Sequence, residues 1–236
     1  MKKITFPELN DYSETVVPIA DSERLKKSIK GMLTIFKNYK INIDQDNYIN
    51  DKTENFGNAI QEIEKHIGDL VQEYCKNKTD EKLVEIFHYI HLWGGITGRN
   101  IYVRKGGFEN NFKLDYYKKI VEKIIDLKQA TLETDLKEIE KLFMSIPFIV
   151  VAYGTKHLRF WSINTNKNNI QLPILDRVIS IGLFDTPYCA WRQYYTYVQQ
   201  MHEEAEKRKV SITALERKLY NEFNESITAL LISFLK

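Results

Sequence analysis

Three residues near the middle of the chain have the types and spacing that covalent chemistry needs. Lys156 follows Gly154 by two residues, and Asp176 lies 20 residues beyond the lysine. A lysine amine can attack an electrophilic carbon and form a Schiff base, provided that it is neutral. A position among apolar neighbours at a helix start would lower the pKa of Lys156 through desolvation and the helix dipole. The spacing therefore marks Lys156 as a candidate nucleophile.

The elements that carry these residues follow from changes in the hydrophobic pattern. A hydrophobic run from Phe143 is predicted to turn at Tyr153-Gly154-Thr155, and Lys156 then opens a short segment. An asparagine-rich polar loop follows, and the chain becomes apolar again at Pro173. Asp176 comes directly before a further apolar run, where aspartate is a good helix N-cap. We therefore predict a turn, a segment carrying the lysine, and a capped helix after the aspartate.

Apolar residues recur at helical spacing through most of the remaining chain. Only five prolines and ten glycines interrupt 236 residues, and the candidate strands are confined to 148–151 and an extended N-terminal arm, residues 1–20. The fold is therefore predicted to be all-α, with nine or ten helices and a polar loop at 41–53. The expected helices begin after Asp21-Ser22, near residue 54, after Thr79-Asp80, near residues 114 and 131, after Asp185-Thr186-Pro187 and at Ser211, and a last apolar segment covers 227–235.

A glycine-rich stretch at residues 94–107 contains five of the ten glycines, together with Arg99, Arg104 and Lys105. It lacks the Gly-Lys-Ser/Thr spacing of a P-loop. Two interpretations stay open: a tight basic connection between helices, or a segment whose glycines let the backbone approach a ligand closely. For a polyanionic ligand, Arg99 and Arg104 are the predicted phosphate contacts.

Composition limits the class of protein. The net charge of +2 is close to zero, so any nucleic-acid-binding surface must be local. Cys75 and Cys189 are far apart in sequence, which indicates reduced thiols rather than a disulfide framework. The N-terminus has no apolar signal core, and no run approaches 18 apolar residues. We therefore expect a soluble cytoplasmic protein without membrane contact.

Histidines offer one further candidate site. His88 and His91 are three residues apart and could share a helix face, but no nearby cysteine or carboxylate completes a metal site. They are predicted to be core or surface residues, and no metal or cofactor is expected. The side chain of His157, although adjacent to Lys156, should point away from it on the helix.

The arrangement of Gly154, Lys156 and Asp176 resembles that of the helix-hairpin-helix DNA glycosylases, in the lysine-bearing branch that includes the 8-oxoguanine DNA glycosylases. Their hairpin reads roughly hydrophobic-Pro-Gly-hydrophobic-Gly-x-Lys, with the catalytic aspartate about 20 residues on. Here Val151 and Ala152 replace the proline and the first glycine. The order and spacing of the other three positions match.

A closer resemblance is to small bacterial proteins with an 8-oxoguanine-glycosylase-like fold. Their pattern looks like Thr-Lys-x-Leu-x-Phe followed by Ile-Leu-Asp-Arg-Val, and residues 155–160 and 174–178 fit it. The string Trp-Gly-Gly-Ile-Thr-Gly-Arg-Asn at 93–100 also looks like part of that pattern. The match is close over about 40 residues. In the rest of the chain only the order of the expected helices matches.

The resemblance implies a two-lobed, all-α helix-hairpin-helix fold that binds double-stranded DNA with one base flipped out. Lys156 would attack C1′ of the sugar and form a Schiff base, which can then collapse by β-elimination. Asp176 would stabilise positive charge on the sugar while capping its helix. The backbone N–H groups of Tyr153, Gly154 and Thr155 would hold a DNA phosphate at a helix start.

A base pocket is expected on the helix predicted to end near Lys209. Aromatic residues there are usually part of a core, but a flipped base needs an aromatic face and amide groups. Related glycosylases supply such residues from a C-terminal helix. The resemblance thus makes Tyr194, Tyr195 and Gln199 candidates for the base pocket.

One unit of residues 1–236 is expected, made of an N-terminal lobe (1–142), a hairpin and catalytic unit (143–183) and C-terminal helices (184–236). Two alternatives stay open: a DNA-binding module that keeps the hairpin without turnover, and an interaction protein or an enzyme acting on a nucleotide-like substrate. Relatives of this type lie beside bacterial antiphage signalling genes, so a defence role with partner proteins is a further expectation.

Overall fold

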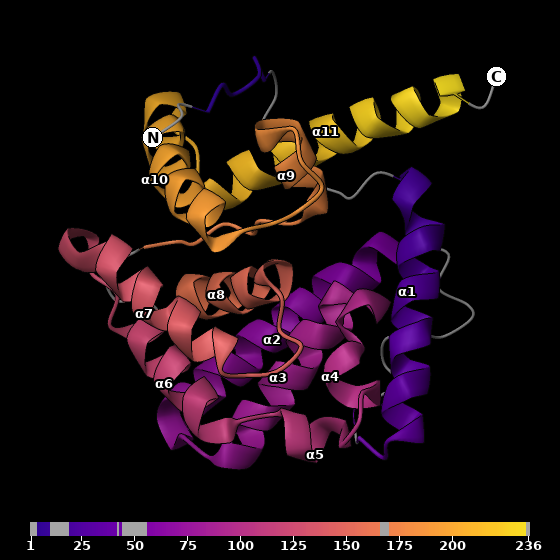
Figure 1. Ribbon diagram of the computed structural model, residues 1–236, viewed down its shortest axis with the longest axis vertical. Helices are drawn as coiled ribbons and strands as arrows, with labels where there is room; N and C mark the ends of the chain where they lie inside the picture. The colour runs from indigo at the N-terminus through magenta and orange to yellow at the C-terminus, as the bar shows by residue number, and fades with distance from the viewer. Residues whose placement is uncertain (1–3, 10–18, 42, 44–55, 166–169, 235–236) are drawn as a thin grey trace.

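The computed structural model describes residues 4–9, 19–41, 43, 56–165 and 170–234, and every regular element among them is helical (Figure 1). The all-α prediction is confirmed, and no strand occurs in these residues. The helices are α1 (Ile19–Asn38), α2 (Phe56–Asn77), α3 (Asp80–Gly94), η1 (Ile96–Gly98), α4 (Asn100–Val103), α5 (Gly107–Asn111), α6 (Leu114–Ile125), η2 (Gln129–Thr131), α7 (Leu132–Met144), α8 (Val151–Thr165), α9 (Arg177–Phe184), α10 (Trp191–Arg208) and α11 (Ile212–Phe234).

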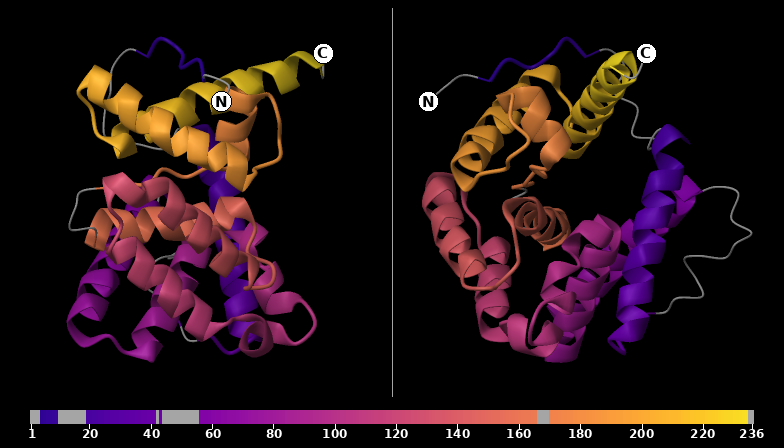
Figure 2. Two further views of the ribbon diagram at one scale, coloured as in Figure 1. Left: turned by 60° about the vertical axis from the view of Figure 1, so that its left-hand side comes forward. Right: turned by 45° about the vertical axis from the view of Figure 1, so that its right-hand side comes forward.

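Helix α8 lies between two groups of helices (Figures 1 and 2). The first group consists of α2, α3 and α6, and α8 packs directly against these three helices. The second group consists of α9, α10 and α11, in which α11 packs against the other two. An extended segment, residues 170–176, joins α8 to α9 and so connects the two groups. The predicted unit 143–183 is thus shared between them, because α8 packs against the first group and α9 belongs to the second. None of the described helices is long and apolar enough to span a membrane.

Two predicted helix starts are confirmed by their N-caps. The Oγ1 of Thr79 accepts the N–H of Lys82 at 3.3 Å, and the Oγ of Ser211 accepts that of Ala214 at 3.1 Å. Such bonds satisfy backbone donors that have no partner inside the helix. The caps therefore fix the starts of α3 and α11 where the sequence places them.

Other predicted ends are wrong. Helix α1 already begins at Ile19, so Asp21-Ser22 lies within it. Asp185 does not open α10 but ends α9, in a left-handed conformation with a φ of 53°. Helix α11 is continuous to Phe234, without a break before residue 227. Most of the predicted 41–53 loop and residues 166–169 lie outside the described residues.

Three histidines lie in an aromatic core between α3 and α8. His88, His91 and His157 are all buried, and the Nδ1 of His157 lies 2.8 Å from the hydroxyl of Tyr117. That hydroxyl also accepts the indole N–H of Trp161 at 2.9 Å. The prediction that His88 and His91 are core or surface residues is confirmed, and both lie in the core. Among the described residues, no group of three or more histidine, cysteine or acidic side chains is placed to hold a metal ion.

The buried histidines should make the fold sensitive to acid. Burial lowers the pKa of His88 and of His157 from 6.5 to about 3, and that of His91 also falls well below 6.5. The unfolded chain therefore binds these protons as the pH falls below 6.5, whereas the folded chain does not. The three together should remove at most about 4 kcal/mol of stability per pH unit below roughly pH 6.

Urea unfolding at pH 7.5, 6.5 and 5.5 measures this loss. His88→Leu, which removes one of the three titrating groups, should reduce the slope below pH 6.5 by about one third. A free energy of unfolding that stays constant from pH 7.5 to pH 5.5 would contradict the assignment.

Candidate active site around Lys156

The turn before Lys156 lies earlier in the chain than predicted. Helix α7 ends at Met144 and α8 begins at Val151, so Gly154 and Lys156 both lie inside α8. The backbone reverses instead near Phe148, which adopts a left-handed φ of 67°. The prediction of a glycine turn at residue 154 is therefore wrong.

A glycine is needed at position 154 for close packing rather than for a turn. A Cβ added there would lie 3.0 Å from Cζ2 of Trp191, on the first turn of α10. The absence of a side chain thus lets the indole approach the backbone of α8. Trp191 also stacks on Phe143, with ring centroids 5.8 Å apart, so this contact joins the end of α7 to the start of α10.

The predicted phosphate site at Tyr153, Gly154 and Thr155 is not available to an anion. The N–H groups of Tyr153 and Gly154 both donate to the carbonyl of Val150 at 2.9 Å, and all three residues are buried. The correction follows from the earlier helix start. The N–H groups at the first two positions of α8, Val151 and Ala152, precede the first intrahelical bonds and have no acceptor within the helix.

Lys156 itself is buried, with 9% of its surface exposed. Its Nζ lies 4.7 Å from the ring centroid of Tyr153 and 6.0 Å from that of Trp93. No hydrogen bond or ion pair holds this ammonium in the part of the chain that the structure describes. Burial lowers the pKa of Lys156, and the neighbouring Asp176 opposes that change. Burial thus shifts Lys156 towards the neutral amine, the form that attacks carbon.

Asp176 is confirmed as the N-cap of α9. Its Oδ1 accepts the N–H of Ile179 at 3.0 Å, and its backbone is extended. Among the charged groups that act on the pKa of Lys156, Asp176 has the largest effect. The cap therefore fixes a carboxylate where it can stabilise a cation that forms at Lys156.

Two further groups that the sequence did not reveal act on Lys156. Burial and the charge of Asp176 raise the pKa of the Cys189 thiol to about 11, so this thiol is protonated at neutral pH. Glu216 forms a buried ion pair with Arg159 at 3.1 Å. Burial raises the pKa of Glu216, and Arg159 opposes the rise. Both lie far from Lys156 in sequence, without a motif of their own.

The glycine-rich stretch packs against the same site. A Cβ on Gly94 or Gly98 would lie 2.6 or 2.4 Å from the ring of Tyr153, so the two glycines form a slot for that ring. The hydroxyl of Tyr153 donates to the carbonyl of Gly95 at 2.8 Å and lies 3.0 Å from Oγ1 of Thr97. The close backbone approach expected of these glycines is therefore to Tyr153, which flanks Lys156.

Arg99 and Arg104 lie on structured backbone rather than on a flexible loop. Arg99 joins η1 to α4, and Arg104 ends α4. Both side chains are exposed. Arg99 directly follows Gly98 and so begins next to the slot for Tyr153.

The candidate base-pocket residues each bond to another residue. Tyr194 is fully buried and donates its hydroxyl to the carbonyl of Pro173 at 3.0 Å, so neither face of its ring is free for a base. Tyr195 donates its hydroxyl to Glu140. Gln199 is exposed and bonds Glu203 on the same helix. The structure therefore corrects the prediction for Tyr194, whereas Tyr195 and Gln199 stay predictions. Trp93, which is half-buried, instead presents an aromatic ring beside Lys156.

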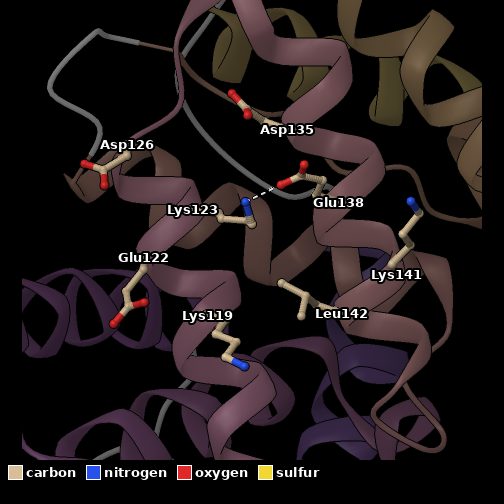
Figure 3. A pocket seen from close by; sticks show the side chains of 8 residues that line it. All are labelled: Lys119, Glu122, Lys123, Asp126, Asp135, Glu138, Lys141 and Leu142. Atoms are coloured by element: carbon tan, nitrogen blue, oxygen red, sulfur yellow. Dashed lines mark hydrogen bonds and ion pairs between the residues drawn. The ribbon is translucent and has the colours of Figure 1, made fainter.

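A surface hollow of about 540 Å³ lies elsewhere, between α6 and α7 (Figure 3). Its walls carry both signs of charge, and Lys123 is paired with Glu138. None of the groups around Lys156 lines it. The lining residues are Lys119, Glu122, Lys123, Asp126, Asp135, Glu138, Lys141 and Leu142.

Residues 66–220 match the family described as "Putative 8-oxoguanine DNA glycosylase OGG-like protein". The chain belongs to this family. No curated protein and no solved structure matches it. The matched range includes Trp93, Lys156, Asp176, Cys189 and Glu216, so the whole candidate site lies within the OGG-like region. The chain is thus a DNA glycosylase-like protein with an all-α fold.

Proposed function

We propose that this OGG-like protein is a DNA glycosylase that removes a damaged or modified base by covalent attack of Lys156. The observation that carries the proposal is a buried lysine, free of ion pairs among the described residues and subject to the charge of Asp176, whose carboxylate caps α9. A lysine kept for structure alone would ordinarily pair with an anion when buried. The family match supports DNA as the substrate class.

In the proposed reaction the lone pair of Lys156 Nζ forms a bond to C1′ of the flipped nucleotide. The glycosidic C1′–N bond breaks, its electron pair leaves with the base, and the proton lost by the amine goes to that base. The C1′–O4′ bond then breaks, O4′ takes a proton from water, and the nitrogen lone pair forms a protonated Schiff base at C1′. This intermediate either hydrolyses or loses a C2′ proton together with the 3′-phosphate, which nicks the strand.

Asp176 would stabilise positive charge on the sugar as the base departs. Trp93 would offer the aromatic face on which the flipped base stacks. The free N–H groups of Val151 and Ala152 would bind a phosphate of the same strand, since a helix N-terminus attracts anions. Each role uses a group that lies around Lys156 or at the start of α8.

Borohydride trapping tests this function, because hydride reduces the C1′–N double bond to a stable amine. The wild-type protein should form a covalent adduct with at least one duplex in a panel of lesion-bearing and phage-modified DNA that includes 8-oxoguanine. Adducts confined to phage-modified duplexes would support the proposed defence role. DNA binding without any adduct would favour the alternative of a binding module that has lost turnover.

Loss of Arg99 and Arg104 should weaken DNA binding on all sequences alike. Each lost phosphate contact should flatten the log–log salt dependence of binding by about one unit. The double variant Arg99→Ala, Arg104→Ala should therefore lower affinity and salt slope while leaving base preference unchanged. Fluorescence anisotropy between 50 and 200 mM salt measures both.

A charge-matched control is Lys119→Ala with Lys141→Ala on the α6–α7 hollow (Figure 3). These lysines lie among acidic side chains, so their removal should leave the salt slope nearly unchanged. Equal slopes for the wild type and the arginine variant would show that residues 94–107 are only a connector.

A further inference from the structure

The extended segment 170–176, which carries Asp176 at its end, is held by buried side chains from three helices. Four consecutive residues each make one such bond. The N–H of Leu172 donates to Oγ of Ser162 (3.0 Å), the hydroxyl of Tyr194 donates to the carbonyl of Pro173 (3.0 Å), the N–H of Ile174 donates to Oε2 of Glu216 (2.8 Å), and the N–H of Leu175 donates to Oγ1 of Thr155 (3.1 Å).

The last of these bonds lies directly beside the two candidate catalytic residues. Thr155 precedes Lys156 on α8, and Leu175 precedes Asp176. The Thr155 side chain is fully buried, and its Oγ1 also lies 3.4 Å from the carbonyl of Leu175 and 3.2 Å from that of Ala152. A hydroxyl can accept one bond and donate another. One side chain therefore ties the backbone that bears the lysine to the backbone that bears the aspartate.

The orientation of the carboxylate depends on this tie. Asp176 caps α9 through the N–H of Ile179, so its side chain moves with the first turn of that helix. The start of α9 is in turn placed by Leu175. A displacement of Leu175 would therefore move the carboxylate relative to Lys156 without unfolding either helix.

We propose that Thr155 is a positioning residue, whose hydroxyl holds Asp176 against Lys156 through the backbone of Leu175. The catalytic consequence rests on the proposed function, whereas the geometric consequence does not. One measurement therefore tests the catalytic consequence on DNA, and a second tests the geometric consequence on the protein alone.

The first measurement is single-turnover base release from a duplex that traps the wild type. Thr155→Val keeps the branched shape but removes the hydroxyl, and it should slow base release about 10- to 100-fold, because small misplacements of reacting groups have effects of that size. Thr155→Ser keeps the hydroxyl and should restore most of the rate. A Thr155→Ser protein as slow as Thr155→Val would overturn the proposal.

Ser162→Ala is the matched control. It also removes a hydroxyl that accepts a backbone N–H from the segment 170–176, in this case the N–H of Leu172. The hydrogen bonds to Pro173, Ile174 and Leu175 still lie between that position and Asp176. Both substitutions should lower the melting temperature, since each leaves a buried N–H unpaired. Only Thr155→Val should slow the reaction. An equal loss of rate in Ser162→Ala would mean that the segment matters only through stability.

A double-mutant cycle shows whether Thr155 acts through the carboxylate. In an Asp176→Asn background, Thr155→Val should change the rate much less than in the wild-type background, because the charge it positions is gone. The same fold-change in both backgrounds would overturn the proposal.

The second measurement needs no DNA. Reductive methylation of Lys156 by formaldehyde and cyanoborohydride, followed by peptide mass spectrometry, gives the pH midpoint of the neutral amine. Asp176 raises the pKa of Lys156 against the effect of burial. Asp176→Asn should therefore lower the midpoint, and Thr155→Val should lower it by a smaller amount, because the attraction weakens with distance.

Ser162→Ala and Thr155→Ser should leave that midpoint at the wild-type value. A midpoint that shifts in Asp176→Asn but not in Thr155→Val would overturn the positioning role, even in a protein that releases no base. A shift in Thr155→Val without base release from any duplex would support the positioning role and count against the proposed function.

Discussion

Lys156→Gln should abolish covalent trapping on DNA by borohydride, whereas the wild type forms an adduct on the same duplex. Without the amine, no double bond to C1′ exists for hydride to reduce, so adduct yield should fall to background. DNA affinity should change little, because Lys156 is buried and makes no ion pair among the described residues. Denaturing gel electrophoresis of a labelled duplex measures the adduct.

The fold should survive this substitution. Burial disfavours the charged form of Lys156 and lowers its pKa, so a neutral side chain removes an unfavourable desolvation. The melting temperature of Lys156→Gln at pH 7 should therefore equal or exceed that of the wild type. Lys141→Gln, at an exposed lysine on α7, is the matched control and should trap normally. Trapping at full yield by Lys156→Gln would remove this residue from the mechanism.

Asp176→Asn should slow base release by about 10²- to 10³-fold while DNA affinity stays nearly constant. Loss of one preorganised electrostatic contact to a transition state commonly has an effect of this size. Asparagine caps a helix nearly as well as aspartate, so the cap on Ile179 should persist. Single-turnover kinetics, binding and thermal melting together distinguish these effects.

Asp185→Asn is the control, because it makes the same change at the other end of α9, where asparagine also tolerates the left-handed conformation. It should leave the rate unchanged. If Asp176→Asn instead unfolds the protein while activity per folded molecule persists, the aspartate is a structural cap only.

Helical periodicity and capping chemistry were sufficient to predict most of the fold. The helices α2, α3, α6 and α7 lie close to where their apolar spacing places them. Thr79 and Asp176 cap as predicted, because a short polar side chain before an apolar run has one dominant local use. These features depend on neighbours in sequence, which a single chain reveals.

The errors arose where tertiary contacts decide the local structure. Gly154 was predicted to form a turn, but its lack of a side chain serves the approach of Trp191 from α10. Asp185-Thr186-Pro187 looks like a helix start, yet Asp185 is the residue that ends α9. The contact of Gly154 with Trp191 leaves no trace in the surrounding sequence.

The candidate site was predictable only in part, for the same reason. Lys156 and Asp176 could be found from spacing because both lie on one continuous stretch of chain. Cys189 and Glu216 reach them from other elements, and Tyr194 proved to be a core residue because its hydroxyl anchors Pro173. A base pocket assembled from distant segments has no fixed spacing to recognise.

The slot that Gly94 and Gly98 form for the ring of Tyr153 also restricts which substitutions this sequence can accept during evolution. A methyl group on either glycine would overlap the ring, so no single change there is neutral while the tyrosine stays. Exchange of the tyrosine for a smaller residue would open a void beside Lys156 and leave the carbonyl of Gly95 without its donor. The tyrosine lies 55 and 59 residues after the two glycines. The three positions can therefore change only together, and a variant at one of them should carry a compensating variant at another.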